Sequence, residues 1–289
     1  MQGIILAVAA YSIWGIFPLF FSYLNDVSPI EVVVHRSIWS LVATLLLGLL
    51  LRRLGKLTSA FEDKKLIGWM GLSAALIAIN WLVYIWAVSN HRVLESSLGY
   101  FMTPVVSLIL ARIFFKERLH PLQAWAGFFA TIAIIWEFIS LGSLPWISLV
   151  LAVAFAFYGV VRKHCKIDGI SGLTIEMFWL LPLGLIWITW QVFDQHNALA
   201  FGSTQTLTLL LIGSGFLTAL PLVLFAMAAR RVDLSIVGFI MYINPSIQFL
   251  IAIFVLNESY PPQRMVTFCI IWFALILFMM GLWKLRKEH

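Results

Sequence analysis

Apolar side chains occur along this chain in long continuous runs that are separated by short polar connections. Most runs are rich in Leu, Ile, Val, Phe and Trp on all sides and do not alternate with polar residues. A helix that crosses a bilayer needs about 20 mostly apolar residues, whereas a strand of a transmembrane barrel alternates between apolar and polar positions. The pattern therefore predicts an all-α membrane protein with ten spanning helices, at 3–23, 30–51, 65–87, 94–114, 120–138, 146–162, 172–191, 206–228, 234–256 and 262–283.

The composition supports this interpretation. Hydrophobic residues make up 62% of the 289 residues and charged residues 11%, which is too little charge to cover a soluble domain of this length. The first apolar run has no basic segment before it and no clean cleavage site after it, so we expect a retained helix and not a signal peptide. The two cysteines, Cys165 and Cys269, are not expected to form a disulfide.

Positive charges gather in alternate connections between the predicted helices. Fifteen of the 19 Lys and Arg residues fall on one side: Arg52, Arg53, Lys56, Lys64, Lys65, Lys116, Arg118, Arg162, Lys163, Lys166, Arg230, Arg231, Lys284, Arg286 and Lys287. Arg92 and Arg264 fall on the other side. Because cytoplasmic loops carry an excess of Lys and Arg, we expect both termini in the cytoplasm. This distribution explains the net charge of +6 without a nucleic-acid partner.

The two halves of the chain repeat one another. The segment YFMTPVVSLILARIFFKE (100–117) aligns with MYINPSIQFLIAIFVLNE (241–258) at a constant offset of 141, which places Pro104 on Pro245. Each half holds five predicted helices, an odd number, so the second copy must cross the membrane upside down. Inverted repeats are typical of secondary transporters, whose binding site lies near the midplane between the repeats. We therefore predict two repeats, at 1–140 and 145–285.

Five stretches carry a resemblance to a known family. They are WGIFPLFF (14–21), EVVVHRSIWS (31–40), NWLVYIWAVSNHRVLESSLGYFMTP (80–104), FFKERL (114–119) and FIMYINP (239–245). Over nearly its full length the chain resembles the drug/metabolite transporter superfamily with its two EamA repeats, and within it the RarD subfamily. The resemblance implies a multi-pass protein of the bacterial inner membrane that moves small amphipathic metabolites such as amino acids. It also implies that helices 1–4 and 6–9 line a cavity, while helices 5 and 10 are peripheral and often form a dimer contact.

Three ionisable residues near the start of the second predicted helix need an explanation. An ionisable group inside a spanning helix is costly and usually faces a bundle interior or a wet cavity. Arg36 cannot deprotonate, so it needs either a carboxylate partner, for which Glu31 and Glu95 are candidates, or an anionic ligand. Glu31 could instead reach the headgroups, and His35 could bond to a neighbouring backbone. If transport is coupled to protons, Glu31, His35 and Glu95 are the candidate carriers.

Other polar and aromatic residues are candidates for the wall of a substrate site. Several share a helix face in pairs or stripes four or three residues apart, and prolines 104, 221 and 245 can interrupt helices beside them, although prolines also bend helices for packing alone. With Arg36, the predicted substrate-binding residues are Tyr11, Trp14, Asn80, Trp81, Tyr84, Ser96, Tyr100, Thr103, Tyr158, Asn244 and Gln248.

The sequence offers little support for catalysis. Of the six histidines, His35 alone lies in the interior of a predicted span, and His120 lies at the edge of another. The chain has no HExxH motif and no nucleophile–base set. We predict no metal, no cofactor and no enzymatic activity. A channel, or a membrane sensor or scaffold that does not transport, is the alternative function, and saturable substrate flux would separate a transporter from it.

Overall fold

The computed structural model describes residues 2–52, 54–90, 92–117, 120–141, 146–165, 167–193, 199–255 and 262–287. The regular elements in these residues are helices. They are α1 (Gln2–Phe21), a short 3-10 turn (Ser22–Leu24), α2 (Pro29–Leu50), α3 (Leu54–Glu62), α4 (Lys64–Ser89), α5 (Val93–Phe115), α6 (Pro121–Leu141), α7 (Trp146–His164), α8 (Gly169–Phe193), α9 (Gln205–Ala229), α10 (Leu234–Ile240), α11 (Ile243–Phe254) and α12 (Pro262–Lys287).

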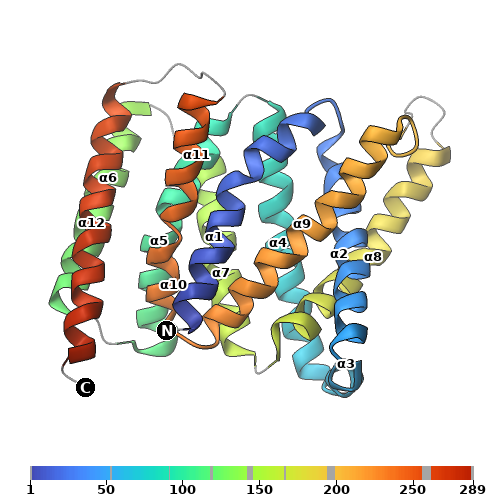
Figure 1. Cartoon of the computed structure of the whole chain (residues 1–289), viewed down its shortest axis with the longest axis horizontal. Coiled ribbons are helices and arrows are strands. Elements are labelled where there is room, and N and C mark those ends of the chain that lie inside the picture. The colour runs from blue at the N-terminus through green and yellow to red at the C-terminus, as the bar shows by residue number, and fades with distance from the viewer. Residues whose placement is uncertain are drawn as a thin grey trace.

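Each of the ten predicted spans corresponds to a helix or, for the ninth span, to the two helices α10 and α11. In the described residues, eight helices are long and apolar enough to cross a membrane, and two shorter apolar segments lie at Ile236–Ile251 and Met265–Gly281. The start of α1 and the end of α12 lie at the same end of the bundle, which we call the termini end (Figure 1). The prediction of an all-helical membrane protein is therefore confirmed.

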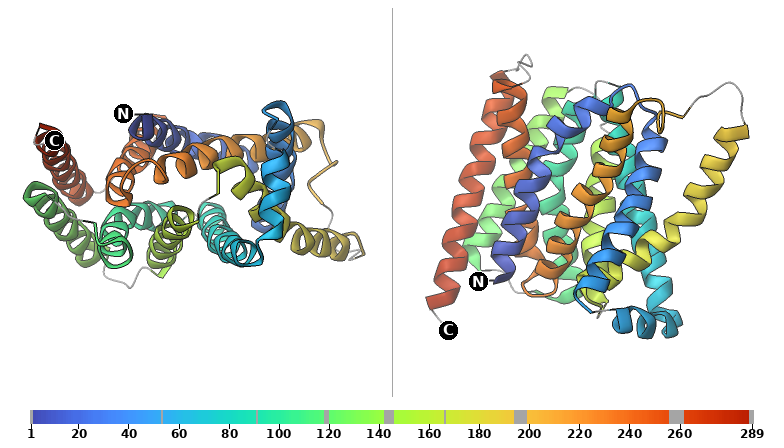
Figure 2. Two further views of the ribbon diagram at one scale, coloured as in Figure 1. Left: turned by 90° about the horizontal axis from the view of Figure 1, so that it is seen from below. Right: turned by 45° about the vertical axis from the view of Figure 1, so that its right-hand side comes forward.

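One local prediction was wrong. Residues 52–64 were expected to be a loop, but they contain α3, a helix of nine residues that lies across the termini end (Figure 2). Leu57 and Ala60 of α3 are buried against Met70 and Ile175, so the helix is held by its apolar face. The nine-residue length is too short to signal a membrane span, and for this reason the hydropathy pattern did not reveal it.

The ninth predicted span, 234–256, is interrupted between α10 and α11 at Met241 and Tyr242. This break lies beside Pro245, one of the prolines that the sequence named as able to interrupt a helix. Pro245 has no N–H for the carbonyl of Met241, and its ring disfavours a regular turn there. The Met241 carbonyl accepts the N–H of Asn244 instead, at 2.9 Å, which tightens the chain by one residue. Residues 256–261, which include the end of the repeated motif, lie outside the described residues.

The other prolines do not interrupt their helices. Helix α5 continues through Pro104 and α9 continues through Pro221, so the expected interruption of the eighth span is absent there. The equivalent prolines of the two repeats, Pro104 and Pro245, thus have different local effects.

Helices of the first half pack mainly on helices of the second half. Helix α1 lies against α9 and α11, α2 against α8 and α9, α4 against α7 and α8, and α5 against α7 and α10. Helices α6 and α12 pack on each other at one edge of the bundle (Figure 2). This interleaving leaves α1, α2, α4, α5, α7 and the α10–α11 break around a common centre.

Helices α2 and α9 approach each other closely at Gly215. Ser40 donates a hydrogen bond to the carbonyl of Gly215 at 2.9 Å, and a Cβ at Gly215 would collide with Trp39 and the Ser40 backbone. A small residue is needed here so that the two backbones can approach.

Candidate functional site

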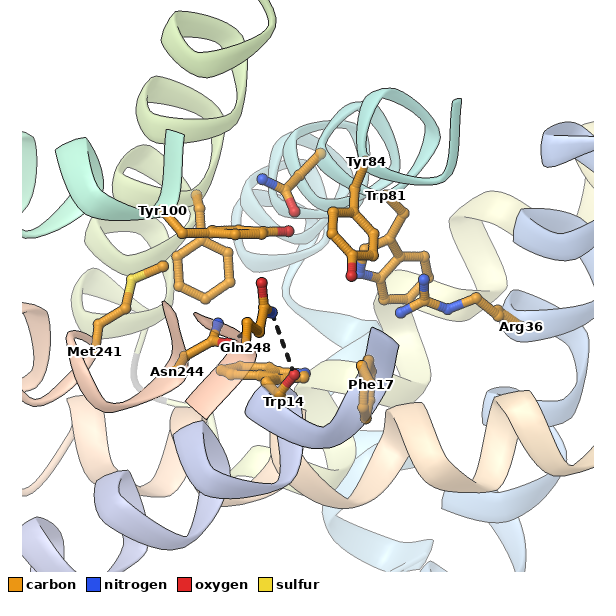
Figure 3. Close-up of a pocket in the computed structure, with 11 residues that line it drawn as sticks. Trp14, Phe17, Arg36, Trp81, Tyr84, Tyr100, Met241, Asn244 and Gln248 are labelled. Atoms are coloured by element: carbon orange, nitrogen blue, oxygen red, sulfur yellow. Dashed lines mark hydrogen bonds between the residues drawn. The ribbon is translucent and has the colours of Figure 1, made fainter. Parts of the chain in front are cut away.

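A cavity lies at the centre of the bundle between the two halves (Figure 3). It offers about 40 Å³ to the centres of water molecules, which is room for roughly three waters. Its lining residues come from six of the helices and the α10–α11 break: Trp14, Phe17, Arg36, Asn80, Trp81, Tyr84, Tyr100, Phe155, Met241, Asn244 and Gln248. A metabolite larger than a few atoms would need the surrounding helices to move apart.

Helical spacing explains why these side chains converge. Asn80 and Tyr84 are four residues apart on α4, and Asn244 and Gln248 are four apart on α11, so each pair lies on one helix face. Tyr100 of α5 lies with its ring centroid 5.7 Å from that of Tyr84. Eight of the twelve residues predicted to bind substrate therefore lie around one cavity.

Arg36 supplies the charge of this cavity. Its side chain is 2% exposed, and its Nε donates a hydrogen bond to Oγ1 of Thr218 at 3.0 Å. The guanidinium lies 4.5 Å from the centre of the Trp81 ring and 4.8 Å from that of Phe21, within the range of cation–π attraction. It pairs with neither Glu31 nor Glu95, which rules out the structural ion pair as its explanation.

Two buried polar groups at the cavity lack a partner among the described residues. One Nη of Arg36 and the hydroxyl of Tyr84 make no hydrogen bond there. Figure 3 shows the Arg36 guanidinium beside the Tyr84 side chain at one end of the cavity. Leaving a buried donor unsatisfied is costly, so two such donors together are suited to an acceptor that enters the cavity.

The amides of the cavity are held in place by the protein. Asn80 donates to the carbonyl of Leu151 at 3.1 Å. Gln248 donates to Oδ1 of Asn244 at 2.8 Å and to the carbonyl of Trp14 at 3.5 Å, and the second of these bonds is drawn in Figure 3. These groups give the cavity polar but uncharged wall positions.

Four predicted wall residues lie elsewhere. Ser96 and Thr103 are buried on α5, and Thr103 bonds back to the carbonyl of Gly99, so the expected stripe reaches the cavity at Tyr100 alone. Tyr11 lies behind Trp14, at a ring distance of 5.5 Å. Tyr158 stacks on Phe225 and does not line the cavity.

The three residues predicted to couple protons do not line the cavity either. Glu31 accepts the backbone N–H groups of Ala200 and Phe201 at 3.1 and 2.8 Å, so it holds the segment before α9 and does not reach the headgroups. His35 stacks on Phe201 at 4.4 Å, and neither of its ring nitrogens has a partner in the described chain, which contradicts the expected backbone bond. Glu95 pairs with Arg92 at 2.6 Å.

A second buried arginine lies nearer the termini end. Arg162 of α7 is 1% exposed and its Nη1 lies 3.1 Å from Oε1 of Glu176 on α8. The same carboxylate accepts a hydrogen bond from Ser73 of α4 at 2.5 Å, and its other oxygen one from Tyr158 at 3.4 Å. This group, which we call the Arg162 network, joins α4, α7 and α8.

Sequence reasoning missed the Arg162 network and three lining residues, Phe17, Phe155 and Met241. Arg162 was counted as a loop charge because it lies near the end of its helix. Phe17 lies three residues after Trp14 and Met241 three before Asn244, so helical spacing from predicted residues could have found both.

Comparisons with known proteins agree with this architecture. Residues 1–138 match the model of the EamA-like transporter family. The chain is 40% identical over 279 residues to "Protein RarD" of Escherichia coli (strain K12), covering 96% of this chain and 94% of that protein. It is 37% identical to "Uncharacterized transporter YojE" of Bacillus subtilis (strain 168), and 32% identical to "Chloramphenicol-sensitive protein RarD" of Pseudomonas aeruginosa, each over 96% of this chain and 93% of the relative.

The fold has a solved counterpart. One crystal structure superposes with a TM-score of 0.73 over 97% of this chain and 99% of that chain, at 13% identity, which shows a shared fold alone. The sequence identities to RarD proteins extend over nearly the whole length, and so the chain belongs to the EamA-like transporter family, as a multi-pass membrane transporter and not an enzyme.

Proposed function

We propose that this protein is a secondary active transporter that moves small amphipathic carboxylates across the bacterial inner membrane by alternating access, with amino acids and related metabolites as the expected class. The observation that carries the proposal is Arg36, a buried cation at a central cavity with an unpartnered Nη and no carboxylate partner. A carboxylate would accept hydrogen bonds from Arg36 and from Tyr84, and the aromatic side chains would surround the apolar part of the substrate.

The packing of the helices supports two inverted repeats, 1–140 and 145–285. If α1, α2, α4, α5 and α6 correspond to α7, α8, α9, α10–α11 and α12, the principal contacts exchange among themselves. The pairing of α1 with α9 becomes that of α7 with α4, α2 with α9 becomes α8 with α4, and α5 with α7 becomes α11 with α1. In secondary transporters with a pseudo-two-fold relation of this kind, the substrate site lies between the halves. The position of the cavity between the halves supports the proposal.

The charge distribution supports an orientation with the termini end in the cytoplasm. In that orientation the Arg162 network lies on the cytoplasmic side of the cavity. Tyr158 connects the two, because its hydroxyl contacts Glu176 while its ring lies 5.9 Å from that of Phe155 in the cavity wall. We assign the Arg162 network to the closed cytoplasmic gate of this conformation.

The α6–α12 pair supports the expected dimer contact of the peripheral helices. It lies at one edge of the bundle, and its outer face carries exposed apolar side chains such as Trp125, Ile139 and Phe273. A second copy of the chain is the proposed occupant of this face.

Counterflow in proteoliposomes tests the proposal. Saturable uptake of labelled amino acids or related carboxylates by the wild type, lost in Arg36→Ala, is the expected result. Uptake that survives the substitution would show that Arg36 has a structural role and does not bind the substrate. Flux that never saturates would favour a channel, and no flux of any carboxylate would favour a sensor or scaffold.

A further inference from the structure

Among its described lining residues, the cavity has one permanent positive charge and no acidic side chain. Asn80, Asn244, Gln248 and the tyrosine hydroxyls are polar but uncharged. No side chain of the site neutralises the positive charge of Arg36. A bound ligand must therefore supply the negative charge.

The carboxylates of the surrounding helices are engaged elsewhere. Four acidic residues lie within the long described helices. Glu31 binds two backbone N–H groups, Glu95 pairs with Arg92, Glu137 accepts a hydrogen bond from Thr267 at 2.7 Å, and Glu176 pairs with Arg162. None of them lines the cavity.

The aromatic rings nearest the charge are also engaged. The Arg36 guanidinium already lies against Trp81 and Phe21, and 5.9 Å from the Phe17 ring centre. A second cation beside these rings would be placed next to Arg36, where like charges repel each other. The cation–π surface at this end of the cavity is therefore not available to a substrate ammonium group.

From these contacts we infer that the site selects carboxylates that carry no ammonium group over the corresponding zwitterionic amino acids. This inference rests on the proposed function and ranks the substrates within it: monoanionic acids with an aromatic or branched apolar body are preferred to the amino acids. The carboxylate neutralises Arg36, and the apolar body contacts Trp14, Phe17 and Phe155. An ammonium group in the same place would lose its water and gain amide and hydroxyl oxygens but no counter-charge.

Matched pairs of ligands test this inference on the purified full-length protein. The pairs differ only in the ammonium group: 3-phenylpropanoate with L-phenylalanine, and 4-methylpentanoate with L-leucine. Binding is measured by calorimetry at pH 7.5, with 2-phenylethylamine as the cationic control, and transport by counterflow. We expect each amine-free acid to bind about 10-fold or more tightly than its amino acid, and the amine not to bind.

A substitution at the uncharged wall sharpens the test. Asn244→Asp places a carboxylate in the cavity and is expected to reverse the preference within each pair. The matched variant Asn244→Leu has the same branching as Asn244→Asp without the charge and is expected to weaken both members of a pair without reversing their order. Thermal unfolding shows whether each variant is folded. If either variant is unfolded, the binding of the matched ligand pairs to the wild-type protein decides the question.

The outcomes separate this inference from the proposed function. Equal or tighter binding of the amino acids, lost in Arg36→Ala, would overturn the inference and leave carboxylate transport in place. Binding of 2-phenylethylamine would also overturn it. If neither acid nor amino acid binds or is transported, both the inference and the proposed carboxylate substrate fail.

Discussion

Two arginines are buried among the described residues of the bundle, and their surroundings are opposite. Arg162 faces a carboxylate that is itself held by Ser73 and Tyr158, whereas Arg36 has a threonine, aromatic rings and an unpartnered Nη. Both lie inside a membrane protein, where an unpaired charge is costly. Since one charge is neutralised by the protein and the other is not, the first is suited to holding helices together and the second to meeting a ligand.

The largest expected effect is on stability, at the paired arginine. Glu176→Gln leaves Arg162 buried without a counter-charge, and removing one member of a buried pair costs about 3–5 kcal/mol. We expect a large fall in the thermal unfolding temperature in detergent. The double variant Arg162→Met/Glu176→Leu should recover most of the loss, and a double variant as unstable as the single one would contradict this explanation.

Removing the other arginine should affect transport and not stability. Arg36→Met takes away a buried charge that has no carboxylate partner, so the unfolding temperature should hold or rise. The apparent KM for a carboxylate substrate should increase about 10- to 100-fold, which corresponds to one or two charge-assisted hydrogen bonds. If the unfolding temperature of Arg36→Met falls as far as that of Glu176→Gln, Arg36 is also needed for stability, and the proposed difference between the two arginines is wrong.

A smaller effect is expected at the other end of the bundle. Glu31→Gln keeps one acceptor oxygen but loses the charge that receives the N–H groups of Ala200 and Phe201, at a cost of about 1 kcal/mol. Hydrogen exchange at these two amides should accelerate, while transport of carboxylates, which depends on Arg36, should persist. Unchanged protection of both amides would show that the carboxylate does not hold this segment.

The smallest effect is a labelling rate beside the Arg162 network. Cys165 is buried between α7 and α8, and burial raises the pKa of its thiol to about 11. In a Cys269→Ser background, maleimide labelling should therefore be slow near pH 7.5. It should rise about tenfold per pH unit up to the thiol pKa, since the thiolate is the reactive form. If Glu176→Gln opens the cytoplasmic side, labelling should accelerate at constant pH, and an unchanged rate would argue against a gate there.

Hydropathy predicted the helices of this protein well, because a membrane span depends on length and composition. It could not predict α3, whose nine residues are held by side-chain packing against α4 and α8, nor the α10–α11 break, which depends on a local hydrogen bond at Met241. Pro104 and Pro245 illustrate the limit, since the same residue in equivalent positions breaks one helix and not the other.

Helical spacing, together with the charge of Arg36 and the position of Trp14 and Trp81 inside their spans, predicted eight residues of the cavity. The interaction partners of these residues could not be predicted in this way. Glu31 and Arg36 are close in sequence and opposite in charge, yet each contacts a different part of the fold. Arg162 of α7 pairs with Glu176 of α8. This pairing depends on how α7 packs against α8, and the residue pattern within a single helix does not predict such packing.

The backbone contact between α2 and α9 has a mechanical consequence. Ser40 and Gly215 are in close contact, so in the proposed alternating access the two helices would pivot about this point and would not slide past each other. Arg36 lies one helical turn from Ser40, and its partner Thr218 lies three residues from Gly215. A side chain so near the pivot would move less than the rest of the two helices. The Arg36 guanidinium would then become accessible from each side of the membrane in turn, while the helices around it move apart and together.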